Sequence, residues 1–313
     1  MRVITAAEVA EALDWKALTD RLAQAFCAGV ESPPRHHHAV QRPDGEATML
    51  LMPAWEQDGY IGVKMVNVFP QNADHGLPAI AGVYLLSEGA HGRPLACIDG
   101  GELTRRRTAA ASALAARELS REDADTLLVA GTGKLAPMVI EAHAAVRPIR
   151  RVRIWGRSPD KARRLAAEYA DRFATEAVTD LQAACADADV ISCVTLSTRP
   201  LIHGQWLTPG THLDLIGAFR PNMRETDADC LARSEVFVDT YAGAQGEAGD
   251  ILQAVDEGGF AFGDIRGELA ELLRGSREGR SGPEAITLFK SVGASLEDLA
   301  AAIEVWEKRA TTA

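Results

Sequence analysis

One turn in the middle of the chain constrains the fold more than any other feature. Residues 128–136 read LVAGTGKLA, so an apolar run enters a Gly-x-Gly turn and Ala136 stands where a third glycine would complete G-x-G-x-x-G. Gly131 permits the tight bend from strand to helix. Gly133 lets the backbone approach a pyrophosphate at the helix N-terminus, where unpaired N–H groups and the helix dipole favour anions. The turn predicts a dinucleotide-binding βαβ unit, with residues 1–125 left to form another part of the protein.

Length and composition limit the remaining choices. A chain of 313 residues suggests two domains. Its net charge of −11 argues against a nucleic-acid or anionic-membrane partner. Five dispersed cysteines without a CxxC pair favour reduced thiols in a cytoplasmic protein. No signal peptide and no apolar run of membrane-spanning length is recognisable, so neither a leader nor a membrane span is expected.

The first part of the chain is predicted to mix helices with antiparallel strands. Thr5 and Glu8 have the spacing of a capping box, which predicts a helix that ends at Gly29. We expect its buried positions to be Val9, Leu13, Leu18, Leu22 and Phe26. Apolar runs at 49–52, 60–68 and 80–86 are separated by turn residues and predict antiparallel strands. An alanine-rich stretch at 104–119 predicts a helix.

From residue 126 the pattern changes to that of a doubly wound parallel sheet. Strand-like apolar runs alternate with helix-like or loop segments, which is the βαβ rhythm of a Rossmann-type α/β fold. These runs lie at 126–130, 151–155, 190–195, 213–217 and 236–239. A final helix at 296–308 could return to the first domain.

The end of the second strand of this unit bears on the choice of nucleotide. An acidic residue there hydrogen-bonds the ribose 2′-hydroxyl of NAD, whereas a basic residue accommodates a 2′-phosphate. The chain reads IWGRSP over 154–159, with no acid at this point. Arg157 could lie against a 2′-phosphate and the adenine, and the Ser158 hydroxyl could donate to the phosphate. We therefore expect NADPH rather than NADH. The alternative is that Arg157 is a solvated turn residue.

Several motifs, in order along the chain, carry a family resemblance. They are GVKMVN at 62–67, ELT at 102–104 followed by RTAA at 107–110, the GTG turn, GEAGDI at 246–251 and TLFKSVG at 287–293. With these motifs the chain resembles the ornithine cyclodeaminase/mu-crystallin family over nearly its whole length. The resemblance implies an NAD(P)-binding Rossmann domain at 119–293. It also implies a smaller α+β domain for substrate binding and dimerisation, formed by 1–118 and 294–313, and a homodimer made through that domain.

The resemblance also implies a set of site residues. Lys64 matches the family's active-site lysine near the substrate carboxylate, and Arg107 matches the arginine that binds the same carboxylate. Arg35 is the candidate for a further arginine. No metal ligand is expected, because adjacent residues of the run His36-His37-His38 would point to opposite faces of an extended stretch. The predicted cofactor contacts are Thr108, Gly131, Thr132, Gly133, Lys134, Leu135, Arg157, Ser158, Thr195, Val292 and Gly293.

Two departures from the family pattern bear on the reaction. Cyclodeaminases carry a glutamate before a Met-Pro pair and an aspartate after a Gly-Gly or Gly-Ala pair, where this chain has Leu50 and Phe219. A bound diamine needs carboxylate partners, because an unpaired buried charge is costly. An apolar wall suits a flat cyclic imine. The resemblance and the departures together predict NADPH-dependent reduction of Δ1-pyrroline-2-carboxylate and Δ1-piperideine-2-carboxylate to proline and pipecolate. Lys64 would either complete the carboxylate clamp or donate a proton to the imine nitrogen.

Two other functions stay open at the level of sequence. One is ornithine cyclodeamination, with acids recruited from elsewhere, such as Glu46 or Asp74. The other is a non-catalytic, NADPH-dependent ligand-binding protein of the mu-crystallin type, since a fold does not fix a function. The presence of both Lys64 and Arg107 favours catalysis over passive binding.

Overall fold

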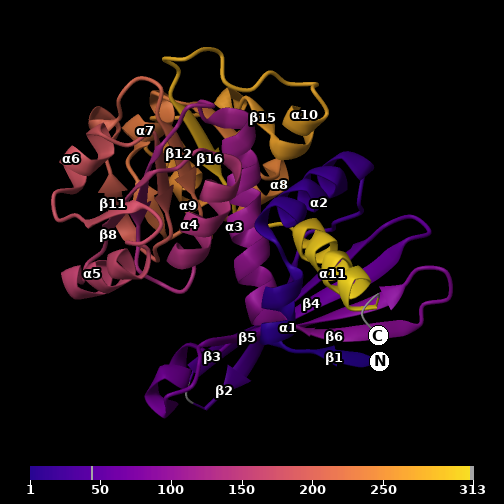
Figure 1. The fold of residues 1–313 in the computed structure, drawn as a ribbon. Helices are drawn as coiled ribbons and strands as arrows, with labels where there is room; N and C mark the ends of the chain where they lie inside the picture. The colour runs from indigo at the N-terminus through magenta and orange to yellow at the C-terminus, as the bar shows by residue number, and fades with distance from the viewer. Residues whose placement is uncertain (44, 311–313) are drawn as a thin grey trace. The chain divides into compact units, whose positions relative to one another are not determined.

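The computed structural model describes residues 1–43 and 45–310. The chain forms two compact units (Figure 1). Unit 1 contains residues 1–108 and the C-terminal segment from Ala294, and unit 2 contains residues 109–293. The boundary after residue 108 falls inside helix α3 (Gly100–Leu119), whereas the boundary expected from sequence, after residue 118, lies near the end of the same helix.

Unit 1 contains, within its described residues, a six-stranded sheet in the order β1-β6-β5-β4-β3-β2. Its neighbours pair antiparallel except for β1 and β6, which are parallel. The three predicted strands are present: β4 has the predicted bounds, and β3 and β5 are longer than expected. Both edge strands and β6 were not predicted. The strands are β1 (Arg2–Ile4), β2 (His36–Arg42), β3 (Gly45–Trp55), β4 (Tyr60–Val68), β5 (Ile80–Glu88) and β6 (Pro94–Asp99).

The helix predicted between Thr5 and Gly29 is in fact two helices. The capping box is present, with the Thr5 side chain accepting from the Glu8 N–H and Glu8 accepting from the Thr5 N–H. However, α1 (Ala6–Ala12) ends before Asp14, whose side chain accepts the Ala17 N–H and begins α2 (Trp15–Ala28). A single continuous helix was therefore the wrong prediction, because the N-cap role of Asp14 was overlooked. The predicted buried positions, Val9, Leu13, Leu18, Leu22 and Phe26, are all buried.

The two faces of the unit 1 sheet have different surroundings. The last helix, α11 (Ser295–Ala310), packs on β3, β4 and β5 and against α2. A short 3₁₀ helix (Pro70–His75) connects β4 to β5. The row of cross-strand neighbours Ile4, Ile98, Tyr84, Lys64 and Met52 is buried. Alternate residues point to the opposite face, and there the row is Val3, Cys97, Leu85, Val63 and Pro53, all apolar and none buried.

Unit 2, every residue of which is described, has the predicted doubly wound parallel sheet. Its eight strands follow the order β15-β14-β16-β12-β10-β7-β8-β9. The strands are β7 (Thr126–Ala130), β8 (Arg151–Trp155), β9 (Ala174–Ala177), β10 (Val190–Cys193), β12 (His212–Leu215), β14 (Glu235–Val238), β15 (Gly267–Glu268) and β16 (Thr287–Lys290). The strand order reverses between β7 and β10, so the loops after these two strands border the crevice in which such sheets bind ligands.

Helices and short elements connect these strands. The helices are α4 (Ala136–Val146), α5 (Pro159–Glu168), α6 (Leu181–Ala186), α7 (Ala228–Ala232), α8 (Tyr241–Glu247), α9 (Gly249–Asp256) and α10 (Leu269–Leu273). A separate parallel pair, β11 (Thr198–Ile202) with β13 (Arg224–Thr226), was not predicted, nor were β9, β15 and β16. No described helix of the chain is long and apolar enough to cross a membrane.

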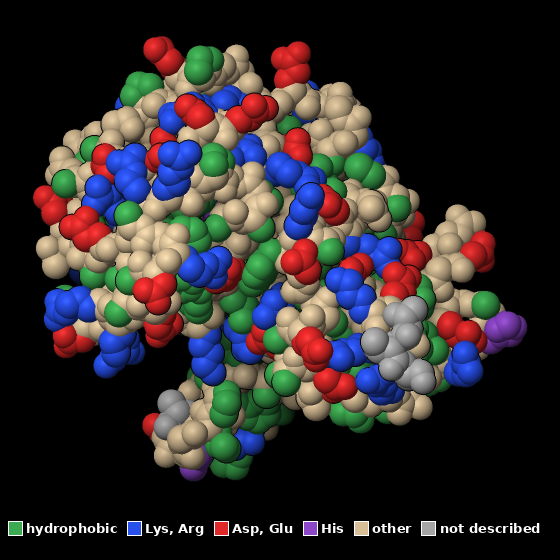
Figure 2. All heavy atoms as spheres, in the orientation of Figure 1, with side chains coloured by type: hydrophobic (Ala, Val, Ile, Leu, Met, Phe, Trp, Pro, Cys, Tyr) green, Lys and Arg blue, Asp and Glu red, His purple; other side chains and the backbone are tan. Residues whose placement is uncertain are grey.

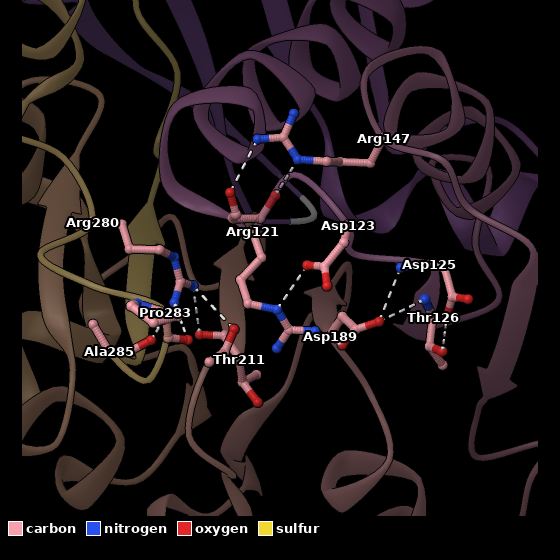
Figure 3. A network of polar contacts seen from close by, with 12 residues as sticks. Arg121, Asp123, Asp125, Thr126, Arg147, Asp189, Thr211, Arg280, Pro283 and Ala285 are labelled. Carbon is pink, nitrogen blue, oxygen red and sulfur yellow. Dashed lines mark hydrogen bonds and ion pairs between the residues drawn. The ribbon is translucent and has the colours of Figure 1, made fainter.

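The amino-terminal edge of the unit 2 sheet is tied together by side chains (Figure 3). The Asp189 carboxylate accepts hydrogen bonds from the backbone N–H groups of Asp125 and Thr126. It also forms an ion pair with Arg121. Arg280 donates to a series of backbone carbonyl groups, including that of Leu119. A hollow of about 700 Å³ opens here, but acidic and basic groups both line it. The network holds the ends of strands together, at the edge opposite to the Gly-x-Gly turn.

Candidate functional site

The predicted site residues Lys64 and Arg107 lie in one buried ion-pair cluster of unit 1. The Lys64 Nζ donates to Asp298 Oδ2 at 2.6 Å, and the Arg107 Nε donates to Asp298 Oδ1 at 2.9 Å. The Arg107 Nη1 donates to Glu297 Oε2 at 2.6 Å. Strand β4 supplies the lysine, α3 the arginine and α11 the two acids. The structure therefore brings together chain segments that are more than 180 residues apart.

Burial makes this cluster electrostatically unusual. Lys64 is 2% exposed, Arg107 is 6% exposed, and both acids are fully buried. Burial lowers the pKa of Lys64 to about 8, although Asp298 acts in the opposite direction. Burial would also lower the pKa of Arg107, but Asp298 and Glu297 raise it above its ordinary value. Burial acts to raise the pKa of Asp298, whereas the two cations lower it. The combined effect of the cations is the larger one, so this pKa lies below its ordinary value.

One donor group of the cluster has no partner among the residues that the structure describes. The Nη2 group of Arg107 makes no hydrogen bond within the described part of the chain, whereas Nε and Nη1 are both used. Arg35, half-buried and directly before β2, adds positive charge near Lys64 and contributes to the lowered pKa of that lysine. The arrangement can accept an anion at Arg107 and can hold or release a proton at Lys64.

Leu50 lies on the same face of the unit 1 sheet as Lys64. Met52 pairs with Lys64 across β3 and β4, and Leu50 is two residues from Met52 along β3. Since alternate residues of a strand share a face, Leu50 belongs to the face that carries the cluster. It is half-buried and carries no charge.

Sequence reasoning missed Glu297 and Asp298. Acidic residues are common in the first turn of a helix, because the positive end of the helix dipole stabilises them. Their position alone therefore does not indicate a functional site. The available signal was their setting: the run ASLEDLAAAI is otherwise apolar or small, and a buried helix rarely carries two acids unless they have cationic partners.

The Gly-x-Gly turn of unit 2 has two different requirements for glycine. Gly131 has φ = +137°, and an added Cβ would lie 2.7 Å from Val194 Cγ2, in the loop after β10. At Gly133, in contrast, an added Cβ would meet no protein atom within 4 Å. Packing therefore explains Gly131 but not Gly133, and the latter fits the close approach of a phosphate to the start of α4. The half-buried Thr132 packs against Gly156 at the end of β8.

The residues expected to choose between nucleotides lie after β8. Arg157 is exposed, and Ser158 is the N-cap residue of α5 without a side-chain hydrogen bond to that helix. Both side chains are therefore available to a ligand at this helix start. Lys134 is exposed and Leu135 is half-buried, next to the turn.

Other predicted cofactor contacts are engaged inside the protein. The backbone N–H groups of Val292 and Gly293 donate to Asp239 Oδ2 at 2.7 and 2.6 Å. The Thr195 hydroxyl and N–H donate to a buried glutamate, Glu225. Thr108 differs from these residues because it is half-buried on the unit 1 part of α3.

Phe219 lies in a loop of unit 2 held in an unusual conformation. It follows Ala218, which has φ = +53°. The ring is half-buried against the hydrophobic core of the unit, and the Arg220 guanidinium lies 5.9 Å from its centroid. No carboxylate occupies the position, as the sequence indicated.

Comparisons with known proteins agree with these motifs. A family model described as the ornithine cyclodeaminase/mu-crystallin family matches residues 1–312. A Δ1-pyrroline-2-carboxylate reductase of Colwellia psychrerythraea is 36% identical over 318 residues, covering 99% of this chain and 100% of that protein. A structure of the Thermococcus litoralis Δ1-pyrroline-2-carboxylate reductase with NADH and L-proline is 28% identical with a TM-score of 0.93, covering 100% of this chain and 98% of that one. An archaeal alanine dehydrogenase dimer with bound NAD, also 28% identical, has a TM-score of 0.91 and covers 100% of this chain and 97% of the other.

Proposed function

Because the chain belongs to the ornithine cyclodeaminase/mu-crystallin family, we propose that it is an NADPH-dependent oxidoreductase that reduces cyclic imino acids. Its substrates are Δ1-pyrroline-2-carboxylate and Δ1-piperideine-2-carboxylate, and its products are proline and pipecolate. The observation that carries the proposal is the buried contact between Lys64 and Asp298, beside an arginine that keeps one donor group available. The similarity to reductases of Δ1-pyrroline-2-carboxylate supports the same reaction class.

Arg107 binds the substrate carboxylate through its Nη2 group, and Arg35 assists from the start of β2. Asp298 and Glu297 fix the other two donor groups of Arg107, so its planar fork is held before the substrate arrives. Such preorganisation reduces the entropy lost on binding and orients the ring for reaction.

Lys64 acts as the proton donor. A nicotinamide cofactor, when bound by unit 2, would supply the hydride for the imine carbon, and the imine nitrogen needs a proton to become an amine. An acid works best when its pKa lies near the working pH, and burial brings the pKa of Lys64 to about 8. Lys64 gives its proton to the ring nitrogen, while Asp298 keeps the ammonium group oriented beforehand. Lys64 then recovers a proton from water.

NADPH is favoured over NADH by the residues after β8. No acid is present at the end of that strand to bind a ribose 2′-hydroxyl. The exposed Arg157 and the unused hydroxyl of Ser158 offer charge and a hydrogen bond to a 2′-phosphate. The similar solved structures contain NADH or NAD, so the preference is a proposal about this chain.

Leu50 and Phe219 favour an imine over a diamine substrate. Neither can pair with the second ammonium group of ornithine, and an unpaired buried charge is costly. Phe219→Asp is expected to weaken imine reduction, because it places a charge where the proposal has an apolar wall. Unchanged kcat/KM in this variant would argue against the assignment of Phe219.

The proposed enzyme is a homodimer formed through the uncovered face of the unit 1 sheet. The row Val3, Cys97, Leu85, Val63 and Pro53 crosses five strands without a charged group. Hydrophobic side chains are also visible around β3 and β5 in Figure 2. Exposed apolar patches of this kind mark interfaces, and a similar archaeal alanine dehydrogenase is a dimer.

The proposal is tested by imine-dependent oxidation of NADPH, with the product identified as proline or pipecolate by chromatography. The assay should show turnover with wild-type protein and a loss of at least 100-fold with Lys64→Met, the scale expected for removal of a general acid. Binding of imine without oxidation would instead support a carrier protein. Ornithine, supplied with oxidised cofactor, is expected to yield neither proline nor ammonia.

A further inference from the structure

Three charged side chains are buried together at the carboxyl edge of the unit 2 sheet. Glu225, Asp250 and Lys290 each have no exposed surface. Asp250 Oδ1 accepts the N–H groups of Glu225 and Thr226, and its Oδ2 lies 3.4 Å from Lys290 Nζ. Lys290 also donates to the carbonyl groups of Leu215 and Gly217, at the end of β12. Asp250 thus pairs with the only ammonium group of this cluster, and Glu225 lies close enough to be influenced by both charges.

The carboxyl group of Glu225 is in direct contact with the loop after β10. Its Oε1 accepts both the N–H and the hydroxyl of Thr195, each at 2.7 Å. An added Cβ on Gly217 would lie 2.4 Å from the Glu225 carboxyl carbon, so this residue packs directly on the acid. The second oxygen, Oε2, is buried and has no hydrogen-bond partner among the described residues. A buried carboxyl oxygen without a partner is costly and calls for an explanation.

The loop that Glu225 contacts lies at the point where the strand order reverses. β10 is the neighbour of β7, and Gly131 of the Gly-x-Gly turn packs against Val194, the residue before Thr195. In such folds one half of a dinucleotide lies over the strands that follow the glycine turn, and the other half lies over the strands on the far side of the reversal. The nicotinamide half is therefore expected on the β10 side, in front of the loop that Glu225 supports.

The charge of Glu225 can change under ordinary conditions. Burial and the nearby Asp250 raise its pKa to about 7, with Lys290 opposing this effect. The other titratable group that faces it is Cys193 on β10, whose pKa is raised well above the ordinary value by burial, so the thiol stays neutral. Asp239, directly after β14, lies near Lys290 and accepts the N–H groups of Val292 and Gly293. When Glu225 is protonated, the charges of Asp250 and Lys290 cancel and the three groups together are neutral. When Glu225 is ionised, the three groups together carry one negative charge.

We propose that Glu225 is a positioning residue whose ionisation sets the preference of the cofactor site between oxidised and reduced nicotinamide. The oxidised ring carries a positive charge and the reduced ring carries none, so a negative charge behind the β10 loop stabilises only the oxidised form. At low pH Glu225 is neutral, and the site then binds the oxidised and the reduced cofactor with more nearly equal affinity. At high pH the site retains the oxidised cofactor more tightly, which opposes product release in the direction of imine reduction.

This inference rests on nicotinamide binding by unit 2, which the proposed function shares, but it needs no imine substrate. The size of the effect follows from Coulomb's law. For a representative separation of about 10 Å between opposite unit charges, at an effective dielectric constant near 20, the interaction changes a binding constant by roughly tenfold. We therefore expect the ratio of the dissociation constants, NADP⁺ over NADPH, to fall roughly tenfold between pH 6 and pH 8.5, with a midpoint near 7.

The experiment measures both dissociation constants over this pH range in the absence of substrate. NADPH is followed by its fluorescence, and NADP⁺ by competition with NADPH. Both forms carry the same phosphate groups, so the ratio cancels their titration. The ratio is measured first for the wild-type protein. A ratio that does not change between pH 6 and pH 8.5 would overturn the proposal, whatever the outcome of the imine assay.

Two variants assign the effect to Glu225. Glu225→Gln keeps an oxygen acceptor for Thr195 but cannot ionise, so its ratio should be constant and close to the wild-type value at pH 6. Glu257→Gln is the matched control, because Glu257 is an exposed carboxylate bonded to the adjacent Arg224, and it should retain the wild-type pH dependence. A wild-type pH dependence in Glu225→Gln would contradict the proposal.

Discussion

The substitution Asp298→Asn tests how the buried cluster controls the acid Lys64. Asparagine keeps the size of the side chain and can still accept one hydrogen bond, but it removes the negative charge that lies 2.6 Å from Lys64 Nζ. Asp298 opposes the effect of burial on the pKa of Lys64, which lies at about 8. Without this carboxylate, the lysine must hold its proton in a buried site beside Arg107, and its pKa should fall further.

The expected size of the effect can be worked out for one representative shift. An opposite charge at this range changes a pKa by roughly one to three units, so we take a fall of about two units, from about 8 to about 6. At pH 8 the wild-type lysine would be about half protonated and the variant about 1%, which gives a loss of about 50-fold in kcat/KM. At pH 6 the same arithmetic gives about twofold, because the acid form of Lys64 persists below its pKa in both proteins.

The assay is the pH profile of kcat/KM for imine reduction between pH 5.5 and pH 9. The wild-type rate should fall tenfold per unit above about 8, and the variant should begin the same fall about two units earlier. Glu307→Gln is the control on the same helix, because Glu307 pairs with Arg21 at the surface, and its profile should match the wild type. An equal loss at pH 6 and pH 8 in Asp298→Asn would refute a proton-donor role for Lys64.

Three further predictions concern the cofactor and the assembly. Arg157→Ala should raise the dissociation constant for NADPH by about 10- to 100-fold, the scale of a lost charge-assisted hydrogen bond, and change that for NADH by less than twofold; equal effects on both, measured by fluorescence titration, would contradict a contact to the 2′-phosphate. Gly133→Ala should leave the melting temperature unchanged, since the added Cβ meets no protein atom, but it should weaken NADPH binding at least tenfold. The control is Gly263→Ala, which also adds a Cβ in open space and should bind NADPH as the wild type does. Leu85→Asp should convert the dimer to a monomer in light scattering coupled to size-exclusion chromatography, because it charges the uncovered apolar face, and a wild-type protein that is already monomeric would refute that interface.

Unit 2 was the easier part of the fold to predict from sequence. Its central strands are buried on both faces, so they read as short continuous apolar runs bounded by turns. β7 is fully buried and has the predicted bounds. β8 also has the predicted bounds, although two arginines alternate with its buried apolar residues. β9 reads ATEA and is only partly buried at the edge of the sheet, so it carries no such signal. β16 forms the first part of the motif TLFKSVG, and its lysine interrupts the apolar pattern that would otherwise indicate a buried strand.

The candidate site could be predicted only in part. The motifs around Lys64 and Arg107 indicated the two cations, but their partners lie 190 or more residues away along the chain. A pairing of this kind is created by the packing of α11 on β4, which no local pattern reveals. The same limit applies to Glu225, whose contact with Thr195 joins strand β13 to the loop after β10 and depends on the folded arrangement of both.

The central claim is tested most directly by steady-state kinetics of the wild-type protein with Δ1-pyrroline-2-carboxylate, using NADPH and NADH in parallel. We expect imine-dependent oxidation of NADPH that yields proline, with kcat/KM at least tenfold higher than for NADH. Turnover should also occur with the six-membered imine. If neither imine accelerates oxidation of either cofactor, while the protein is folded and binds NADPH, the chain is not a cyclic imino acid reductase.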